Sequence, residues 1–173
     1  MKKRIIVLGL CAITLLAACK TNGGGKVEEV EGLTLRNAIE KSADKIVEEI
    51  PRGSRVAIVA FESANVSLSE YIMEELNGEL FDRGIDVVDR QNLAHVLEEL
   101  NFQMSQYVSE ETARSLGLFL GADVVITGQL TGFGNMYRYR TNAINVETAA
   151  RVSITRFDVQ NDRELQRMIE GAQ

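Results

Sequence analysis

The sequence contains few of the residues that form disulfides and metal sites. Its 173 residues include two cysteines, Cys11 and Cys19, and one histidine, His95. Cys11 lies in an N-terminal segment that we expect to be removed, and we expect Cys19 to be modified, so no pair of thiols remains for an intramolecular disulfide. With one histidine and no free cysteine, a zinc site of the usual composition is excluded as well. The protein must therefore be stabilised by packing.

The chain also has no excess of positive charge. It carries 19 Lys and Arg against 25 Asp and Glu, a formal net charge of −6. Without Lys2, Lys3 and Arg4, which belong to the expected N-terminal signal, the balance is 16 against 25, or −9. Binding to nucleic acid depends on the neutralisation of phosphates by Lys and Arg. We therefore expect no nucleic acid partner.

The N-terminal hydrophobic run is too short to span a membrane comfortably. It extends from Ile5 to Leu16, follows three basic residues, and has the pattern of a secretion signal. Leu16, Ala17, Ala18 and Cys19 then resemble the lipobox of bacterial lipoproteins, in which the cysteine thiol is acylated and the chain is cleaved before the cysteine. An ordinary signal peptide or an uncleaved anchor is the alternative interpretation, although the polar residues that follow Cys19 disfavour an anchor.

The resemblance to lipoproteins predicts three regions. Residues 1–18 are the signal peptide, residues 19–33 are the lipidated Cys19 and a Gly-rich flexible tether, and residues 34–173 are one globular domain. Lys20 stands where Asp commonly signals retention at the inner membrane, so we expect an outer-membrane anchor with the domain in the periplasm. No cofactor is expected apart from the covalent lipid, which contributes roughly 0.8 kcal/mol per buried methylene to membrane binding.

Hydrophobic spacing predicts a parallel first half of the domain. A helix from Thr34 to Pro51 is followed by a strand over 56–61, which is apolar throughout and so buried on both faces. Ser67 and Glu70 have the spacing of a capping box that opens a second helix. Gly84 ends this helix, and a second strand follows over 85–88. A strand, helix and strand in fewer than 35 residues indicate a parallel crossover.

The second half has the pattern of an antiparallel sheet. Asp89 is expected to cap a helix over about 93–100, and Ser109 begins a further helix that ends at Gly121. Alternating strands follow from Val124 to Val159. A short helix capped by Asp162 ends the pattern. Tyr137 and Tyr139 alternate in one phase and Ile144 and Val146 in the other, so we expect a bulge or bend near Asn142. The fold class predicted is α/β (α+β), with a mixed sheet and helices packed on it.

No catalytic constellation is evident, and we expect a protein that is not an enzyme. His95 lies off the apolar stripe of its predicted helix, and no nucleophile elbow accompanies it. Adjacent acids, Glu74 with Glu75 and Glu98 with Glu99, point about 100° apart on a helix, so they indicate a solvated face rather than a glycosidase pair. The turn at 132–134 precedes a strand and forms no phosphate site.

One short segment is a candidate binding site. Tyr137, Arg138, Tyr139 and Arg140 place aromatic side chains on one face of a strand and guanidinium groups on the other. In one interpretation the two tyrosines pack on the core and the two arginines are solvated. The other is a partner-binding patch, because Tyr and Arg are enriched at interface hot spots.

Three segments resemble the family of CsgG-like and LpoB-like bacterial lipoproteins. The resemblance covers roughly residues 55–157, in the family's order, and lies in Val87 to Leu93 with Val96 to Glu98, in Leu116 and Gly117 with Gly121 to Gly128, and in Asn145 to Thr148. It implies helices on a mixed sheet and no catalytic residues. Two differences stand out: no insertion is long enough for membrane-spanning hairpins, and Ala149 and Ala150 follow the last segment where a glycine is common.

The resemblance implies two alternative functions. In the first, the protein is an accessory module of an envelope protein, in particular an activator of a penicillin-binding protein in peptidoglycan synthesis. In the second, it is a subunit of an oligomeric export or assembly complex, which makes a homo-oligomer the expected state. The long spacer of the activator type is absent, since about a dozen tether residues reach roughly 20 Å.

Overall fold

The computed structural model describes residues 32–89 and 109–171. Its elements belong to one compact unit, and in chain order they are α1 (Leu35–Glu49), β1 (Arg55–Glu62), α2 (Val66–Asp82), β2 (Asp86–Val87), α4 (Glu110–Leu120), β3 (Val124–Phe133), β4 (Met136–Asn145), β5 (Arg151–Gln160) and α5 (Arg163–Glu170). The helix predicted after Asp89, with His95, lies outside the described residues.

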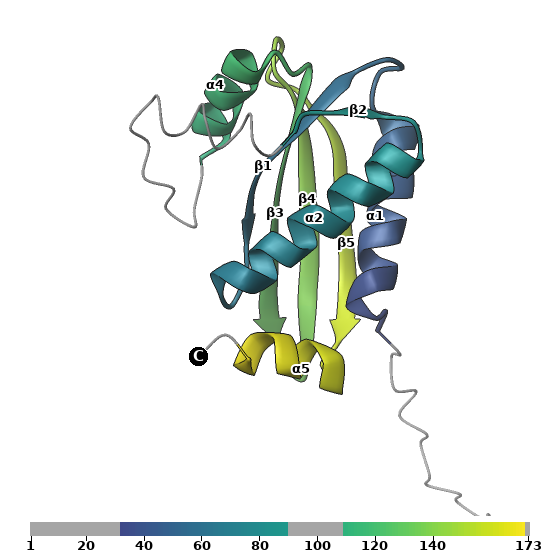
Figure 1. Ribbon diagram of the computed structural model, residues 1–173, viewed down its shortest axis with the longest axis vertical. Coiled ribbons are helices and arrows are strands. Elements are labelled where there is room, and N and C mark those ends of the chain that lie inside the picture. Colours follow the sequence, from purple (N-terminus) through teal and green to yellow (C-terminus); the bar gives the residue numbers. More distant parts are fainter. Residues whose placement is uncertain (1–31, 90–108, 172–173) are drawn as a thin grey trace, which may run out of the picture. The chain divides into compact units, whose positions relative to one another are not determined.

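The five strands form one mixed sheet in the order β2-β1-β3-β4-β5 (Figure 1). β1 pairs in parallel with both β2 and β3, whereas β4 is antiparallel to β3 and to β5. The predicted parallel crossover and antiparallel second half are therefore confirmed, although β2 is only two residues long. None of the described helices is both long enough and apolar enough to cross a membrane.

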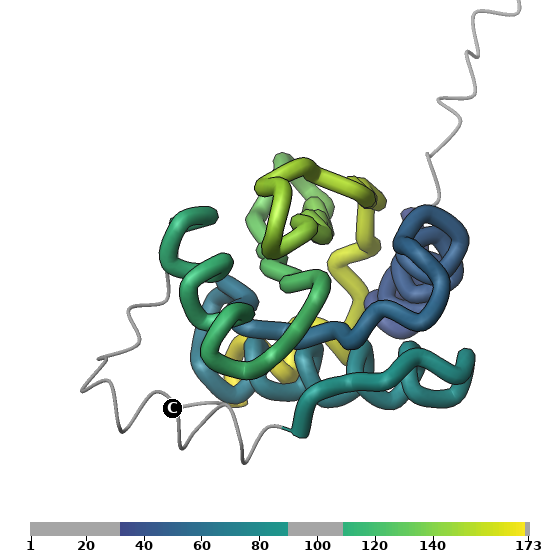
Figure 2. Tube along the Cα trace, turned by 90° about the horizontal axis from the view of Figure 1, so that it is seen from above, coloured from purple at the N-terminus to yellow at the C-terminus, as the bar shows by residue number. Residues whose placement is uncertain are grey.

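Helices cover the two faces of the sheet unequally. α1 and α2 pack on one face over the larger core, to which Ile39, Leu76 and Tyr139 belong. α4 packs on the other face, over a smaller core with Val59, Val125 and further residues at one end of the strands. Figure 2, which looks from above, shows α4 and α1 on opposite sides with strands between them. β1 lies between the two cores, as its apolar run predicted.

Most of the predicted helix ends are confirmed, but the capping box is wrong. Thr34, Ser109 and Asp162 cap α1, α4 and α5, and Gly121 ends α4 with a φ of 63°. α2, however, begins one residue before Ser67. Its N-cap is Asn65, which accepts a hydrogen bond from the Leu68 backbone at 2.8 Å.

Asn65 caps two helices at once, which explains why it takes this role. Its side-chain nitrogen donates to the carbonyl oxygens of Met168 and Ile169, both at 3.1 Å. These carbonyls belong to the last turn of α5, where the helix itself leaves them without partners. Sequence spacing could not reveal the second contact, because α5 is more than 100 residues away along the chain.

The bulge predicted near Asn142 lies on the neighbouring strand. β4 pairs with β3 without interruption from Asn145 to Met136. The register shift occurs between β4 and β5, where Ala143 and Ile144 pair with Ser153 and Arg151. The apolar parity of β4 changes for another reason: Tyr139 and Ala143 face the core under α1, whereas Ile144 faces the core under α4.

The hairpin between β4 and β5 keeps its turn without the usual glycine. Asn145 accepts hydrogen bonds from the backbone and the hydroxyl of Thr148, at 2.8 and 2.9 Å. Ala149 then adopts a φ of 60°, a left-handed conformation that favours glycine. The replacement therefore leaves the path of the chain intact at the expense of local strain.

Two glycines permit the close packing of this sheet. A Cβ atom on Gly117 of α4 would lie 2.4 Å from a Val125 methyl group, and one on Gly128 of β3 would lie 2.1 Å from the Phe61 ring. Real Cβ atoms do not approach so closely, so any larger residue would force the elements apart. Both glycines fall in the segment on which the family resemblance rests.

We expect Asn65→Ala to lower the free energy of unfolding by about 2 kcal/mol, because the substitution removes the cap of α2 and two bonds to α5. Ser67→Ala is the control, with a change within about 0.5 kcal/mol, since Ser67 is exposed and does not cap the helix. Urea unfolding of the full chain measures both. Equal losses in the two variants would contradict the assignment of Asn65 as the cap.

We expect Gly128→Ala to destabilise the protein by about 3 kcal/mol, because the added methyl group would also lie 2.9 Å from the Arg140 carbonyl oxygen, which cannot move without breaking the sheet. Gly132→Ala, on the same strand, meets no atom within 4 Å and should be neutral or slightly stabilising. Thermal unfolding of the two variants tests this. A destabilised Gly132→Ala would show that the strand is sensitive to any change.

Candidate functional site

β4 places the four predicted site residues on two faces of the sheet. Tyr137 and Tyr139 face the core under α1, where Tyr139 is fully buried and Tyr137 partly so. Arg138 and Arg140 alternate with them and therefore point to the opposite face. The predicted alternation is confirmed. The two arginines are partly exposed on that face, and binding itself stays a prediction.

Tyr139 is a core residue with an unusual hydroxyl. Its ring lies 5.4 Å from that of Phe61, between centroids. Among the described residues the hydroxyl has no partner of standard hydrogen-bond geometry. Burial raises the pKa of Tyr139 far above its ordinary value, and the nearby Ser42 hydroxyl opposes this by a smaller amount. Tyr139 therefore stays neutral and serves packing.

Ser42 belongs to a buried triangle of hydroxyl groups. It is bonded to Thr141 of β4 and Thr155 of β5 at 3.1 Å each, and the two threonines are 2.7 Å apart. All three side chains are completely buried. The triangle fixes α1 on the last two strands, since each hydroxyl satisfies the others in a site that water does not reach. It has no access for a substrate.

Arg138 is held by two neighbours. Its Nε atom donates to the Asp158 carboxylate at 2.9 Å. Its guanidinium carbon lies 3.8 Å from the centroid of the Phe133 ring, in a cation–π contact. Phe133 is 55% exposed, so the pair presents an aromatic ring and a guanidinium group together at the surface.

Arg140 has no such partners and lies directly opposite Arg156 of β5. Neither side chain forms a hydrogen bond or an ion pair with any described residue. The Nε atom of Arg140 is buried without an acceptor in the described part of the chain. Two guanidinium groups with no acid between them thus project from the same face of adjacent strands.

We call this region the open face. It consists of Gln129, Thr131 and Phe133 of β3, Arg138, Arg140 and Asn142 of β4, and Ile154, Arg156 and Asp158 of β5. α4 has 11 residues and is about 16 Å long, whereas each of these strands has ten residues and spans about 34 Å. α4 can therefore cover only one end of the strands. Ile154 is 43% exposed on the remaining length.

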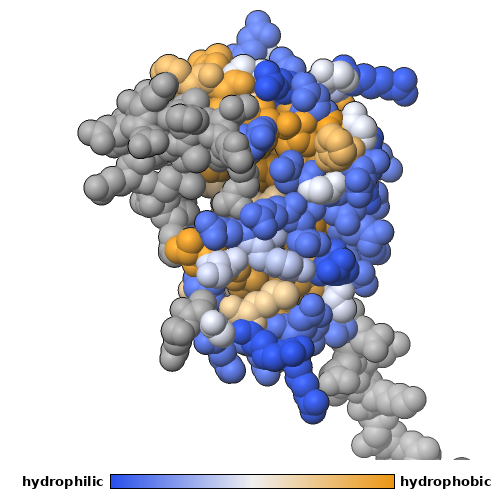
Figure 3. All heavy atoms as spheres, in the orientation of Figure 1, coloured by the Kyte–Doolittle hydropathy of each residue, from blue (hydrophilic) through white to orange (hydrophobic). Residues whose placement is uncertain are grey.

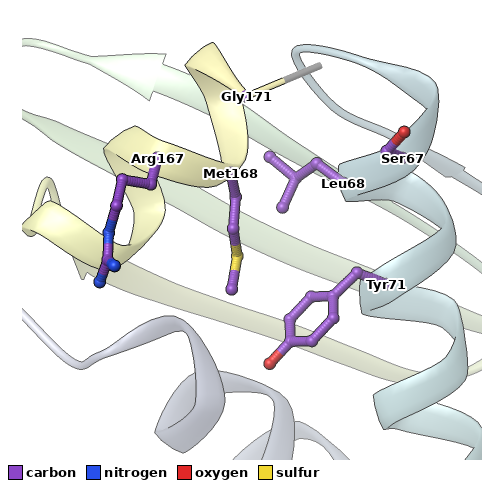
Figure 4. Close-up of a pocket in the computed structure, with 6 residues that line it drawn as sticks. All are labelled: Ser67, Leu68, Tyr71, Arg167, Met168 and Gly171. Atoms are coloured by element: carbon purple, nitrogen blue, oxygen red, sulfur yellow. The ribbon is translucent and has the colours of Figure 1, made fainter.

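A pocket lies between α2 and α5, away from the open face. Figure 4 shows Leu68, Tyr71 and Met168 converging on it, with Ser67, Arg167 and Gly171 at its rim. Its volume is about 240 Å³. Burial raises the pKa of Tyr71, and the Glu75 carboxylate adds to this effect. The lining is mainly apolar, and its groups do not form a recognisable catalytic arrangement.

Apolar side chains are also exposed at α4. Leu118 and Phe119 are 66% and 62% exposed. In Figure 3, hydrophobic residues gather near α4, whereas hydrophilic residues follow α2 across the middle of this view. Within residues 32–89 and 109–171, no group of three or more His, Cys, Asp or Glu could hold a metal ion.

Sequence reasoning missed Arg156, Asp158 and Phe133, which complete the open face. The antiparallel pattern predicted neighbouring strands in this half of the chain, but it did not give the register that puts Arg156 opposite Arg140. The predicted lipobox, Leu16 to Ala18, and Cys19 lie outside the described residues, so lipidation stays a prediction.

We expect Tyr139→Phe to leave stability at neutral pH unchanged or to raise it by up to about 1 kcal/mol, because it removes a buried hydroxyl without a partner. In the wild type the unfolded tyrosine ionises near pH 10 while the folded one stays protonated, so stability is lost as pH rises above about 10. Urea unfolding from pH 7 to 12 should show a shallower decline in the variant. A loss above about 1 kcal/mol at pH 7 would show that the hydroxyl is bonded.

Solved structures share the fold, among them three of LpoB. The LpoB C-terminal domain from Salmonella enterica aligns with a TM-score of 0.64 and 17% identity, over 73% of this chain and 98% of that one. The domain from Escherichia coli aligns with a TM-score of 0.62 and 16% identity, over the same shares. The NMR structure of E. coli LpoB aligns with a TM-score of 0.60 and 13% identity, over 91% and 83%.

The comparison with family models shows to which family the chain belongs. No curated protein matches the chain. A model of the family described as "Curli production assembly/transport component CsgG" matches residues 55–146, which is more than half of the 173 residues. The match includes Gly117 and Gly128, the close-packing glycines, and ends at the start of the Asn145 turn. The chain therefore belongs to the CsgG family.

Proposed function

We propose that the protein is a lipid-anchored binding module of the bacterial envelope that acts without catalysis. Acyl chains on Cys19 hold it at the periplasmic side of the outer membrane, and the domain docks on another envelope protein. The observation that carries the proposal is the open face. On this part of the sheet Ile154 and Phe133 are exposed, and two arginine side chains, Arg140 and Arg156, form no ion pair with a described acid. Exposed aromatic and arginine side chains are typical of protein interfaces.

The partner we propose is a penicillin-binding protein, whose activity in peptidoglycan synthesis the docking would stimulate. The proposal rests on the resemblance of the chain to LpoB-like lipoproteins, and the shared fold of the LpoB C-terminal domain is in agreement with it. Since a short tether reaches only about 20 Å, the partner would have to approach the outer membrane.

The alternative is a subunit of an oligomeric assembly or export complex. The family's description as an assembly and transport component favours it. The two functions differ in oligomeric state: a ring or another closed oligomer in detergent, seen by size exclusion and negative stain, supports the alternative, whereas a monomer supports the accessory module.

The anchor is tested by metabolic labelling with a fatty-acid probe. We expect the wild-type chain to be labelled, and Cys19→Ser to lose the label completely because the acceptor sulfur is gone. Labelling that persists in Cys19→Ser, or a wild-type chain without label, would contradict the anchor.

Docking is tested by photocrosslinking in intact cells. A photoreactive residue at Ile154 of the open face should give a discrete adduct with an envelope protein. The control position is Phe81 of α2, which is 70% exposed but lies on the helix side of the sheet, and it should give none. Equal adducts at both positions would contradict a docking surface, and an adduct with a second copy of the chain would support the oligomer.

A further inference from the structure

We infer that Arg140 and Arg156 form a carboxylate-binding pair, and that the segment that docks on the open face is an acidic segment of a protein. The inference rests on the proposed docking function and adds the chemistry of the partner to it. It concerns two residues of the surface, whereas the docking proposal concerns the surface as a whole.

The register of the sheet brings the two guanidinium groups together. Arg140 and Arg156 are directly opposed on neighbouring antiparallel strands. The Cβ atoms of such pairs lie about 5 Å apart, and like charges in this position are unfavourable. Two forked guanidinium groups at this spacing can bind one carboxylate between them, or two carboxylates of one segment, because their paired N–H groups donate hydrogen bonds to the carboxylate oxygens.

The remaining acids of the region, among the residues that the structure describes, do not neutralise the pair. Asp158 is engaged with Arg138. Glu62 lies in the same row, but two strands away from Arg140, beyond Gln129, and the two side chains form no ion pair. In a chain with 25 acidic and 19 basic residues, a like-charged arginine pair without an acid is therefore a local exception.

The fixed position of Arg140 also fits a binding role. Its Nε atom is buried without an acceptor, so packing rather than hydrogen bonding holds the stem of the side chain. A guanidinium group held in this way loses little conformational freedom when it binds. Arg156 is exposed and completes the pair from the solvent side.

The neighbours of the pair favour a protein segment over a phosphate polymer or a membrane surface. Ile154 and Asn142 lie beside it in the next row of the sheet, and they offer apolar contact and an amide, as peptide recognition requires. Polyanions and anionic membranes are bound by long basic tracts. The net charge, −6 for the full sequence and −9 without Lys2, Lys3 and Arg4 of the expected signal, would repel them outside this one pair.

The test uses the full chain in detergent micelles and a fluorescein-labelled peptide of alternating Glu and Thr residues, with fluorescence anisotropy as the readout. The matched control peptide has Gln in place of Glu. We expect R140Q/R156Q to weaken binding of the Glu peptide by about tenfold or more, because charge-assisted hydrogen bonds are lost. Arg52→Gln, in the exposed connection between α1 and β1, removes a charge elsewhere and should not alter binding.

A purely structural role for the pair makes a different prediction. If the arginines served stability, R140Q/R156Q would lower the unfolding midpoint. If they serve a ligand, the midpoint should stay the same or rise, because the repulsion between them is removed.

Three results would overturn the inference. These are equal binding of the Glu and Gln peptides, a loss in Arg52→Gln as large as in R140Q/R156Q, or tighter arginine-dependent binding of polyphosphate or phosphatidylglycerol vesicles than of the peptide. The docking proposal is tested separately by the photocrosslink at Ile154. If the adduct persists when R140Q/R156Q is added to the crosslinking chain, docking stands and the inference on the arginine pair is contradicted. If no adduct forms while both arginines are present, docking itself is contradicted.

Discussion

The structure depends on the burial of β1 on both faces between two parallel neighbours. A strand that is apolar on both sides requires cover from both sides, so α1 and α2 pack on one face and α4 on the other. α4 is too short to follow the strands along their whole length. The open face is thus a direct consequence of how the core is closed, and the arginines of β4 and β5 are in the part that is left.

Close packing between layers explains the glycines of the family segment. Gly117 lets α4 approach Val125, Gly128 leaves room for Phe61, and Gly121 ends the helix in a left-handed conformation. Each glycine therefore has a separate physical reason, in the packing between elements or in the end of the helix. The family segment is a requirement of the fold, while the candidate site lies on strands next to it.

The segment of β4 with the tyrosines and arginines contributes to the core on one face and to the surface on the other. Tyr139 fills the core against Phe61, whereas Arg138 and Arg140 face outward. The hydroxyl triangle under α1 fixes the inner side, and the arginines of the outer side make no contact with it. A strand of this kind joins a rigid interior to a surface that is available for recognition.

The sequence by itself determined the mixed sheet, the order of its elements and most helix caps, because hydrophobic period and capping residues act over a few neighbouring positions. It also determined the two faces of β4. Only the tertiary structure decided that Asn65 rather than Ser67 caps α2, since the contacts of Asn65 with α5 span more than 100 residues. It also decided that Arg156 stands beside Arg140, because pairing between strands depends on how the whole sheet closes and not on local spacing.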